Sequence, residues 1–397
     1  MRTIGVVTVG RSDFGIYRPI LEAIREDAEL ELRLIVSGMH LSPHYGFTVE
    51  QIETEGYKVD ERVEMLLSAD SPEGVAKSIG LGTMGFAQVY AHSRPDILLV
   101  LGDRFEMHAA ALAALPFNIP VAHIHGGELT EGAMDESLRH AITKLSHLHF
   151  TSTKEYAQRV VQLGEEPWRV TVSGAPSLDN LNRTVLLDST GLKERFGLRI
   201  AAAPLLVTFH PVTLEYMQVN SQINELLRAL HERGSSVIFT LPNADTGNSV
   251  IRQKIASFVE YHANSAQAVE SLGMQGYFSL MKLSAAMVGN SSSGIIEAAS
   301  FGLPVVNIGS RQKGRTRSEN VIDVGYNHSE ILQGIQQAVS PAMHQRMQGM
   351  KNPYGDGHAA ERIIDRLREV PLNKKLIVKR FYDISSPDLA ETINSEQ

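Results

Sequence analysis

With 397 residues, the chain is longer than one hydrophobic core usually supports, so two domains are expected. Its hydrophobic content of 43% and charged content of 21% are typical of a water-soluble globular protein. The formal net charge of -8 argues against a nucleic-acid or membrane partner, and the lack of cysteine excludes disulfides, thiolate metal ligands and a cysteine nucleophile.

The chain opens with a short apolar stretch at residues 3–9, which is soon followed by Arg11 and Asp13. This stretch is too short for a signal peptide and is typical of a first β-strand. No stretch approaches the roughly 18 apolar residues of a membrane span. We therefore expect a cytoplasmic protein.

In the first half, short apolar stretches alternate with amphipathic ones. We predict strands at residues 3–9, 32–38, 96–102, 120–125, 147–152 and 169–174. Helices are predicted at residues 17–27, 105–115 and 135–147. Continuous apolar strands that alternate with helices favour a parallel sheet covered on both faces.

A polar, turn-rich stretch follows Gly174, and the strand pattern then restarts at residues 205–211, 236–243, 285–294 and 304–309. Residues 357–370 are predicted as a late helix. We therefore predict an α/β fold of two doubly wound, Rossmann-like domains, with the ligand site in the cleft between them, beyond the carboxyl ends of the strands. The expected boundaries are 1–175 and 205–370 for the domains, 176–204 for the connection and 371–397 for a tail.

Most of the predicted strands end in polar residues. In the first half these are Asp13, Asp103, Arg104, His125 and Glu128, and in the second half His210, Asn243 and Ser291. Any one of them is also what an ordinary turn contains. Together they favour a ligand site.

Residues 288–302 place three serines before a predicted helix that begins near Gly294, with Glu297 near its first turn. A helix N-terminus favours phosphate, and a carboxylate there suits a ribose diol; a plain serine N-cap is the alternative. Residues 309–317 carry four basic side chains, including Arg311. They suit a diphosphate, or form a solvated basic loop.

His123 and His125 lie two residues apart, as in some metal-dependent hydrolases, and on a strand they point the same way. A full set of metal ligands is lacking, so we expect no metal. Asp135 lies at the start of its helix, facing the strand ends. Glu136 and His140 are expected to pair on that helix, and His147 and His149 are expected to be structural.

Six segments occur in an order that is specific to one family: RSDFGIYRPIL, LGDRFE, HIHGGELTEGAMDESLRHAITKLSH, TFHPVT, LPNADTGN and GNSSSGIIEAASFGLPVVNIGSRQKGR. They cover nearly the whole chain. In these segments the sequence resembles the hydrolysing UDP-N-acetylglucosamine 2-epimerases of sialic-acid and legionaminic-acid pathways. The resemblance implies a glycosyltransferase-B-like fold, a homodimer or higher homo-oligomer, a nucleotide-sugar substrate, and no cofactor or metal.

The resemblance also implies residue roles. Asp103 and Asp135 match acidic catalytic positions, Asp13 a supporting position, and Glu128 the second acid of the Gly-Gly motif. The nucleotide-binding positions of the family are matched by Arg11, Arg104, His210, Asn243, Ser291, Ser292, Glu297 and Arg311. Of these, Arg104 matches a position near the bound nucleotide sugar.

One position departs from the sialic-acid members, which carry a catalytic glutamate where this chain has His125. An imidazole can take over the proton transfers of a carboxylate. The HIHGGE segment favours the legionaminic-acid branch, whose substrate is N,N'-diacetylbacillosamine linked to UDP or GDP. A glycosyltransferase of the same architecture, a non-hydrolysing epimerase, an inactive nucleotide-sugar sensor and a metallohydrolase are the alternatives.

Overall fold

The computed structural model describes residues 1–67, 71–130, 134–200, 202–241, 248–270 and 272–384. It divides into two compact units. The first unit contains Met1–Glu128, Ala133–Pro176 and His358–Gln397, and the second contains Leu129–Gly132 and Ser177–Gly357.

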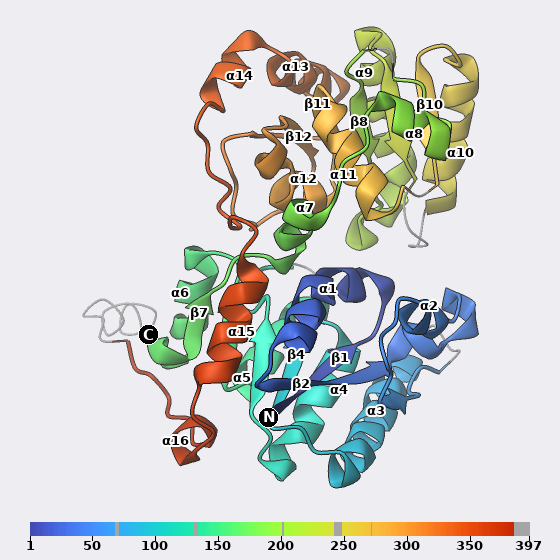
Figure 1. Ribbon diagram of the computed structural model, residues 1–397. Coiled ribbons are helices and arrows are strands. Elements are labelled where there is room, and N and C mark those ends of the chain that lie inside the picture. The colour runs from blue at the N-terminus through green and yellow to red at the C-terminus, as the bar shows by residue number, and fades with distance from the viewer. Residues whose placement is uncertain (68–70, 131–133, 201, 242–247, 271, 385–397) are drawn as a thin grey trace, which may run out of the picture. The chain divides into compact units, whose positions relative to one another are not determined.

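The first unit is built on a parallel sheet of seven strands in the order β3-β2-β1-β4-β5-β6-β7 (Figure 1). The strands are β1 (Arg2–Thr8), β2 (Leu30–Ser37), β3 (Glu61–Val63), β4 (Ile97–Leu101), β5 (Val121–Ile124), β6 (Leu148–Thr151) and β7 (Val170–Val172). The helices are α1 (Arg11–Glu26), α2 (Val49–Thr54), α3 (Pro72–His92), α4 (Phe105–Ala114), α5 (Met134–Leu145), α6 (Lys154–Gln162), α15 (Ala359–Glu369) and α16 (Lys374–Ile377).

The second unit has a parallel sheet of six strands in the order β10-β9-β8-β11-β12-β13. The strands are β8 (Leu205–Thr208), β9 (Val237–Thr240), β10 (Ala266–Val269), β11 (Ala286–Gly289), β12 (Val305–Ile308) and β13 (Val321–Val324). The helices are α7 (Asp179–Arg183), α8 (Ser189–Phe196), α9 (Val219–Arg233), α10 (Asn248–Tyr261), α11 (Gly273–Leu283), α12 (Ser292–Ile296), α13 (His328–Ala338) and α14 (Pro341–Arg346).

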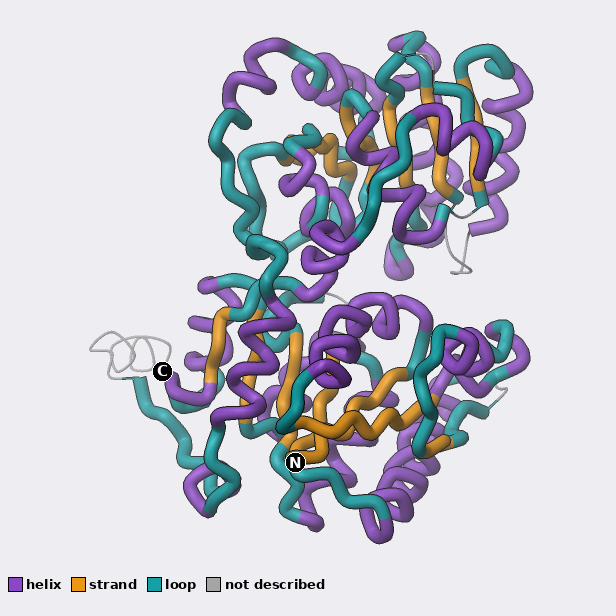
Figure 2. Tube along the Cα trace, viewed as in Figure 1, coloured by secondary structure: helices purple, strands orange, loops and turns teal. Residues whose placement is uncertain are grey.

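In each unit the helices cover the sheet (Figure 2). In the first unit α1 packs against α15, while α3, α4 and α5 pack against one another in chain order. Right-handed crossovers place these two groups on opposite faces of the sheet, because the chain winds in opposite directions from its centre. The fully buried strands β4, β5 and β6 therefore carry the apolar core between two helical layers.

The predicted fold class is confirmed: both sheets are parallel and doubly wound. All ten predicted strands are present, but β3, β10 and β13 were not predicted. Each of these three strands is an edge strand. Their sequences ERV, AQAV and VIDV include polar or charged residues and leave side chains partly exposed, so they lack the apolar stretch that marks a central strand.

Two segments group differently from the expected boundaries. Helix α15, expected with the second domain, packs against α1, and the side chain of Arg2 donates to the carbonyl of Arg368 at 2.8 Å. The expected connection 176–204 contributes α7 and α8 to the second unit. The apolar side chains Ile363, Ile364 and Leu367 of α15 belong to the core of the first unit, which explains its place there.

Strand order reverses beside β1 and β4 in the first unit, and beside β8 and β11 in the second. In open α/β sheets the ligand lies beyond the carboxyl ends of the strands at this switch point. We therefore expect ligand-binding residues in the loops that follow β1, β4, β8 and β11. None of the helices in the described part of the chain is both long and apolar enough to cross a membrane.

We expect Gly289→Ala to destabilise the second unit by about 3 kcal/mol or more. Gly289 has φ +136° beside β8, and a Cβ there would overlap the carbonyl oxygen of Thr208. Urea unfolding followed by circular dichroism measures the change. The control is Gly302→Ala, whose φ of +59° is left-handed but whose Cβ would meet no atom within 4 Å; it should cost about 1–2 kcal/mol. Equal losses would contradict the steric argument.

Candidate functional site

Asp13 lies in the first turn of α1, directly after β1, and is 3% exposed. One of its carboxylate oxygens accepts hydrogen bonds from the Val9 amide at 2.8 Å and from the Thr8 hydroxyl at 2.9 Å. Burial raises the pKa of Asp13 to about 6, against the opposing effect of these two bonds. A carboxyl group with this pKa can gain or lose a proton near neutral pH.

His40 shares the Thr8 hydroxyl with Asp13. Its Nε2 lies 3.0 Å from Thr8 Oγ1, and its Nδ1 lies 2.7 Å from Thr48 Oγ1. Burial lowers the pKa of His40 to about 4, and the charges of Arg104 and Arg11 act in the same direction. His40 is therefore neutral at physiological pH and part of the frame around Asp13. Arg11 itself is exposed at the start of α1.

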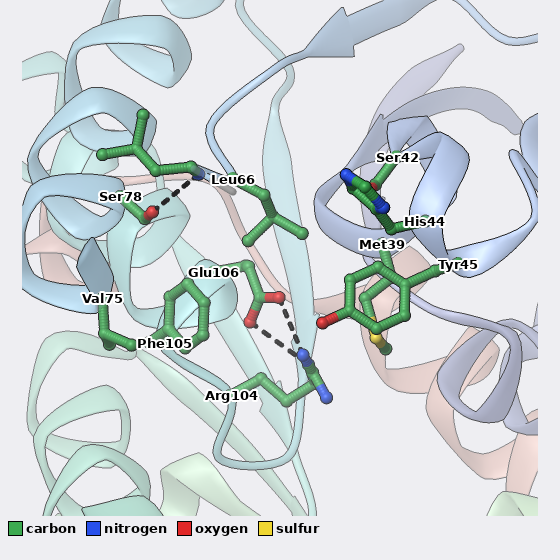
Figure 3. A pocket seen from close by; sticks show the side chains of 11 residues that line it. Met39, Ser42, His44, Tyr45, Leu66, Val75, Ser78, Arg104, Phe105 and Glu106 are labelled. Atoms are coloured by element: carbon green, nitrogen blue, oxygen red, sulfur yellow. Dashed lines mark hydrogen bonds and ion pairs between the residues drawn. The ribbon is translucent and has the colours of Figure 1, made fainter. Parts of the chain in front are cut away.

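Arg104 follows β4 and precedes α4. Its Nη2 donates to the buried Glu106 at 2.8 Å and its Nε at 3.2 Å. Burial lowers the pKa of Arg104, but the charges of Glu106, Asp13 and Asp135 outweigh it, and the pKa is raised. The pair forms the polar side of a cavity of about 240 Å³, which Tyr45, Leu66 and other side chains also line (Figure 3).

Arg139 links two of the predicted catalytic residues. This side chain of α5 is 3% exposed. Its Nη2 donates to a carboxylate oxygen of Asp103, and its Nη1 donates to the carbonyl oxygen of His125 at 2.8 Å. Asp103 follows β4 and His125 follows β5, so this guanidinium joins the ends of two neighbouring strands.

Asp135 lies in the first turn of α5 and is half-buried. Its pKa is raised by burial and by the negative charge of Asp103, while Arg104 and Arg139 oppose the shift. The two predicted catalytic acids thus lie close enough to influence each other. Two neighbouring carboxyl groups, of which Asp135 has a raised pKa, suit a reaction in which protons are accepted and donated.

His125 has a left-handed backbone, with φ +66°. Its Nδ1 lies 2.6 Å from Glu128 Oε1, and the Ser152 hydroxyl donates to the same oxygen at 2.7 Å. All three residues are buried. This group connects through Arg139 to Asp103. The structure therefore brings Asp13, Arg104, Asp103, Asp135, His125 and Glu128 into one continuous set in the first unit.

The sequence suggested that His123 and His125 lie on one strand and point the same way, and this prediction is wrong. Strand β5 ends at Ile124, and the left-handed His125 turns out of it. His123 instead bonds the Gly102 carbonyl through Nε2 at 2.7 Å, and burial lowers its pKa to about 3. Among the described residues, no three His, Asp or Glu side chains are grouped to hold a metal ion.

The remaining histidines of this stretch have structural partners. His140 Nε2 lies 3.0 Å from Glu136, which confirms the predicted pair. His147 accepts a hydrogen bond from the Val121 amide at 3.1 Å. His149 pairs with Glu165 at 3.0 Å. They stabilise the sheet and its helices.

In the second unit, His210 and Asn290 join the ends of β8 and β11. The His210 amide donates to Asn290 Oδ1 at 2.7 Å, and Asn290 Nδ2 donates to the His210 carbonyl at 2.8 Å. Burial lowers the pKa of His210 to about 4, with a smaller effect from the charge of Arg311. The neutral imidazole is held at the switch point of this sheet.

Ser291 caps α12, which begins at Ser292. Contrary to the sequence expectation, Glu297 is not in the first turn of this helix, because α12 has only five residues and Glu297 is its C-cap. The Ser177 hydroxyl donates to Glu297 at 2.8 Å, and burial raises the pKa of Glu297. The buried carboxyl group of Glu297 is thus bonded to the Ser177 hydroxyl.

Arg311 Nη1 and Gln312 Nε2 donate to the Asn290 carbonyl at 3.1 and 2.9 Å. Arg311 therefore lies beside Asn290 and His210, whereas Arg317 of the same basic loop pairs with Asp323. The predicted nucleotide-binding residue Asn243 lies outside the described residues.

Sequence reasoning missed Glu106, Ser152 and Gln312 as neighbours of the predicted residues. Arg139 lies four residues after Asp135 and therefore on the same helix face, but we assigned it no role from the sequence. The i, i+4 spacing was the one available signal, because a bond between segments 36 residues apart leaves no local pattern.

The model of the UDP-N-acetylglucosamine 2-epimerase family matches residues 22–368. The chain belongs to this family. It is 37% identical, over 96% of its length and 99% of the relative, to a UDP-N,N'-diacetylbacillosamine 2-epimerase (hydrolyzing) of Legionella pneumophila. It is 38% identical, over 82% of its length and 85% of the relative, to a GDP/UDP-N,N'-diacetylbacillosamine 2-epimerase (hydrolyzing) of Campylobacter jejuni.

The fold of this family member also matches solved structures. A UDP-GlcNAc 2-epimerase from Neisseria meningitidis, crystallised with UDP-GlcNAc, superposes with a TM-score of 0.76 at 19% identity. The match covers 92% of this chain and 99% of the other. At this identity the match establishes the two-domain fold, and the geometry described above carries the argument about chemistry.

The pH dependence of stability tests the environment of Asp13. Its folded pKa of about 6 lies above its ordinary 3.8. Its contribution to stability is therefore full below the ordinary pKa and is lost as the pH rises through about 6, a change of about 3 kcal/mol. Asp13→Asn should remove this loss between about pH 4 and pH 7, as measured by urea unfolding. A curve for Asp13→Asn parallel to the parent would contradict the assignment.

Proposed function

We propose that this protein is a hydrolysing nucleotide-sugar 2-epimerase. Its substrate is UDP-N-acetylglucosamine, or UDP- or GDP-linked N,N'-diacetylbacillosamine, and its products are the free 2-epimer and a nucleoside diphosphate. The observation that carries the proposal is a group of acids and bases around Arg139. Arg139 bonds Asp103 and the His125 carbonyl, Glu128 bonds the His125 ring, and the charges of Asp103 and Arg139 act on Asp135. The alignment with two hydrolysing relatives over most of the chain supports it.

The reaction begins with an elimination. A base removes the proton from C2 of the sugar, the C1–O bond to the diphosphate breaks, and a 2-acetamidoglucal remains. Water then adds across the double bond, and the new C2 proton arrives on the opposite face. This sequence needs one group that accepts a proton and another that donates one, which the differing environments of His125, Asp103 and Asp135 provide.

The leaving diphosphate needs local positive charge and hydrogen-bond donors, because the chain as a whole carries a net charge of -8. We assign this role to Arg311, Ser291 and Ser292 of the second unit. His210 and Asn243 are assigned to nucleotide binding, and the buried Glu297 to the ribose hydroxyls. In the first unit, Arg11 and Arg104 are the cations assigned to the nucleotide sugar, and Asp13 supports Arg104 electrostatically.

Three further assignments belong to the same proposal. The names of the two relatives favour the diacetylbacillosamine sugar, and the family resemblance favours a role in legionaminic-acid or sialic-acid synthesis. A cytoplasmic location and a homodimeric or larger assembly are proposed from the family resemblance. The alternatives with this fold are a glycosyltransferase, which would need an acceptor, and a non-hydrolysing epimerase, which would return a nucleotide sugar.

Product analysis distinguishes these activities. With UDP-N-acetylglucosamine and UDP-N,N'-diacetylbacillosamine side by side, proton NMR should show free UDP and a free manno-configured amino sugar without any acceptor. We expect kcat/KM to favour the diacetylated sugar by at least about tenfold, or about 1.4 kcal/mol in transition-state binding. Free UDP with retained configuration at C2, or an epimerised sugar still bound to UDP, would exclude the proposal.

Asp135→Asn and Asp103→Asn should each lower kcat by about 100-fold or more, because each removes a proton-transferring group. UDP affinity, measured by calorimetry, should change by less than about threefold. Glu136→Gln is the matched control on α5, since Glu136 pairs with His140; its kcat should stay near the parent value. Because Asp103 also pairs with the buried Arg139, thermal melting must accompany its variant. Unchanged turnover in the folded Asp135→Asn variant would contradict the assignment.

A further inference from the structure

One carboxylate oxygen organises His125. Glu128 Oε1 lies 2.6 Å from His125 Nδ1 and 2.7 Å from the Ser152 hydroxyl that donates to it. The three residues are 8%, 3% and 2% exposed, so little water competes for these bonds. Because an ionised carboxylate only accepts hydrogen bonds, we assign the proton of this contact to the Nδ1 of His125. In the neutral ring, Nε2 is then an unprotonated base.

The backbone holds His125 in place at both ends of the residue. Its amide donates to the Phe150 carbonyl at 3.0 Å, and its carbonyl accepts from Arg139 at 2.8 Å. Its φ of +66° is costly for a residue with a side chain, by about 1–2 kcal/mol. The described part of the chain offers Nε2 of His125 no hydrogen bond. Among the described residues, the imidazole is therefore anchored through Nδ1.

The Gly-Gly turn brings Glu128 back toward His125. Gly127 has φ +78°, and a Cβ there would overlap the Tyr156 carbonyl oxygen. A Cβ on Gly126 would lie only 3.1 Å from both His123 Nδ1 and Thr143 Oγ1. Ser152 follows β6, the neighbour of β5 in the sheet. The serine hydroxyl therefore comes from a rigid element outside the turn.

We propose that Ser152 is a positioning residue of the reaction. By holding Glu128, Ser152 fixes His125 in the tautomer with the proton on Nδ1, so that Nε2 takes the C2 proton of the sugar. The inference rests on the proposed function and goes further, because it gives His125 a defined atom and a defined state. In this step the C2–H bond breaks and the Nε2–H bond forms. The C2–H electron pair becomes the C1=C2 bond, and the diphosphate leaves with the electron pair of the C1–O bond.

Kinetics test the role of Ser152. Ser152→Ala should lower kcat about 10-fold or more and leave KM within about twofold, because substrate binding does not depend on the tautomer. The acidic limb of the pH profile of kcat should also move, because Glu128, which holds the His125 ring, has lost a hydrogen bond. Ser152→Thr keeps the hydroxyl and should recover most of the lost rate. Ser146→Ala is the matched control, a buried serine that donates to the Ile142 carbonyl at 2.7 Å, and it should leave kcat and its pH profile unchanged.

Nitrogen-15 NMR of the histidine rings reads the tautomer without turnover. The His125 signal is identified by its loss in His125→Asn. In the parent protein it should show a protonated Nδ1 and an unprotonated Nε2 above the acidic limb, and in Ser152→Ala a mixture of tautomers. A protonated Nε2 in the parent, or a folded Ser152→Ala with unchanged tautomer and pH profile, overturns the proposal. If neither sugar is turned over while the tautomer is as expected, it is the proposed function that fails.

Discussion

A buried cation holds the ends of two neighbouring strands together in the first unit. Arg139, on α5, donates to Asp103 after β4 and to the His125 carbonyl after β5, so it fixes two strand ends and a helix relative to one another. A buried guanidinium without a partner is costly, by several kcal/mol, and a partner removed by mutation leaves that cost uncompensated. The predicted acid Asp103 is therefore also a structural counter-ion. Because the same guanidinium also holds the His125 carbonyl, chemistry and stability are coupled at Asp103.

Cations held in place by hydrogen bonds also explain how an acidic protein can act on an anionic substrate. The chain has 45 acidic and 37 basic residues, so positive charge must be placed locally. Arg104 is held by the buried Glu106, and Arg311 is held by the Asn290 carbonyl. Because hydrogen bonds fix these guanidinium groups in advance, little reorganisation is needed when a charged group arrives. Preorganised local cations, rather than the net charge, determine what such a surface binds.

The sequence predicted those features that leave a local pattern. Buried strands such as residues 97–101 are continuous apolar runs, and polar residues at strand ends indicated Asp103, His125 and His210. Three edge strands were missed. Two of them, Glu61–Val63 and Val321–Val324, include polar side chains that face solvent. The placement of α15 and the hydrogen bond of Ser152 could not be predicted from the sequence either. They join segments that are distant in sequence, where only the packed structure determines which groups meet.

His125 shows why an imidazole that takes the place of a carboxylate needs hydrogen-bond partners that a carboxylate does not need. A carboxylate, which the resemblance to the sialic-acid members leads us to expect at this position, offers two equivalent oxygens and needs no choice of tautomer. An imidazole has two different nitrogens, and only one of them can be the base in a given orientation. The second nitrogen must be occupied, and here Glu128 occupies it at 2.6 Å. Because Glu128 is itself buried, it needs a donor of its own, and Ser152, the residue after β6, supplies one. The imidazole is therefore a usable base only together with these two partners.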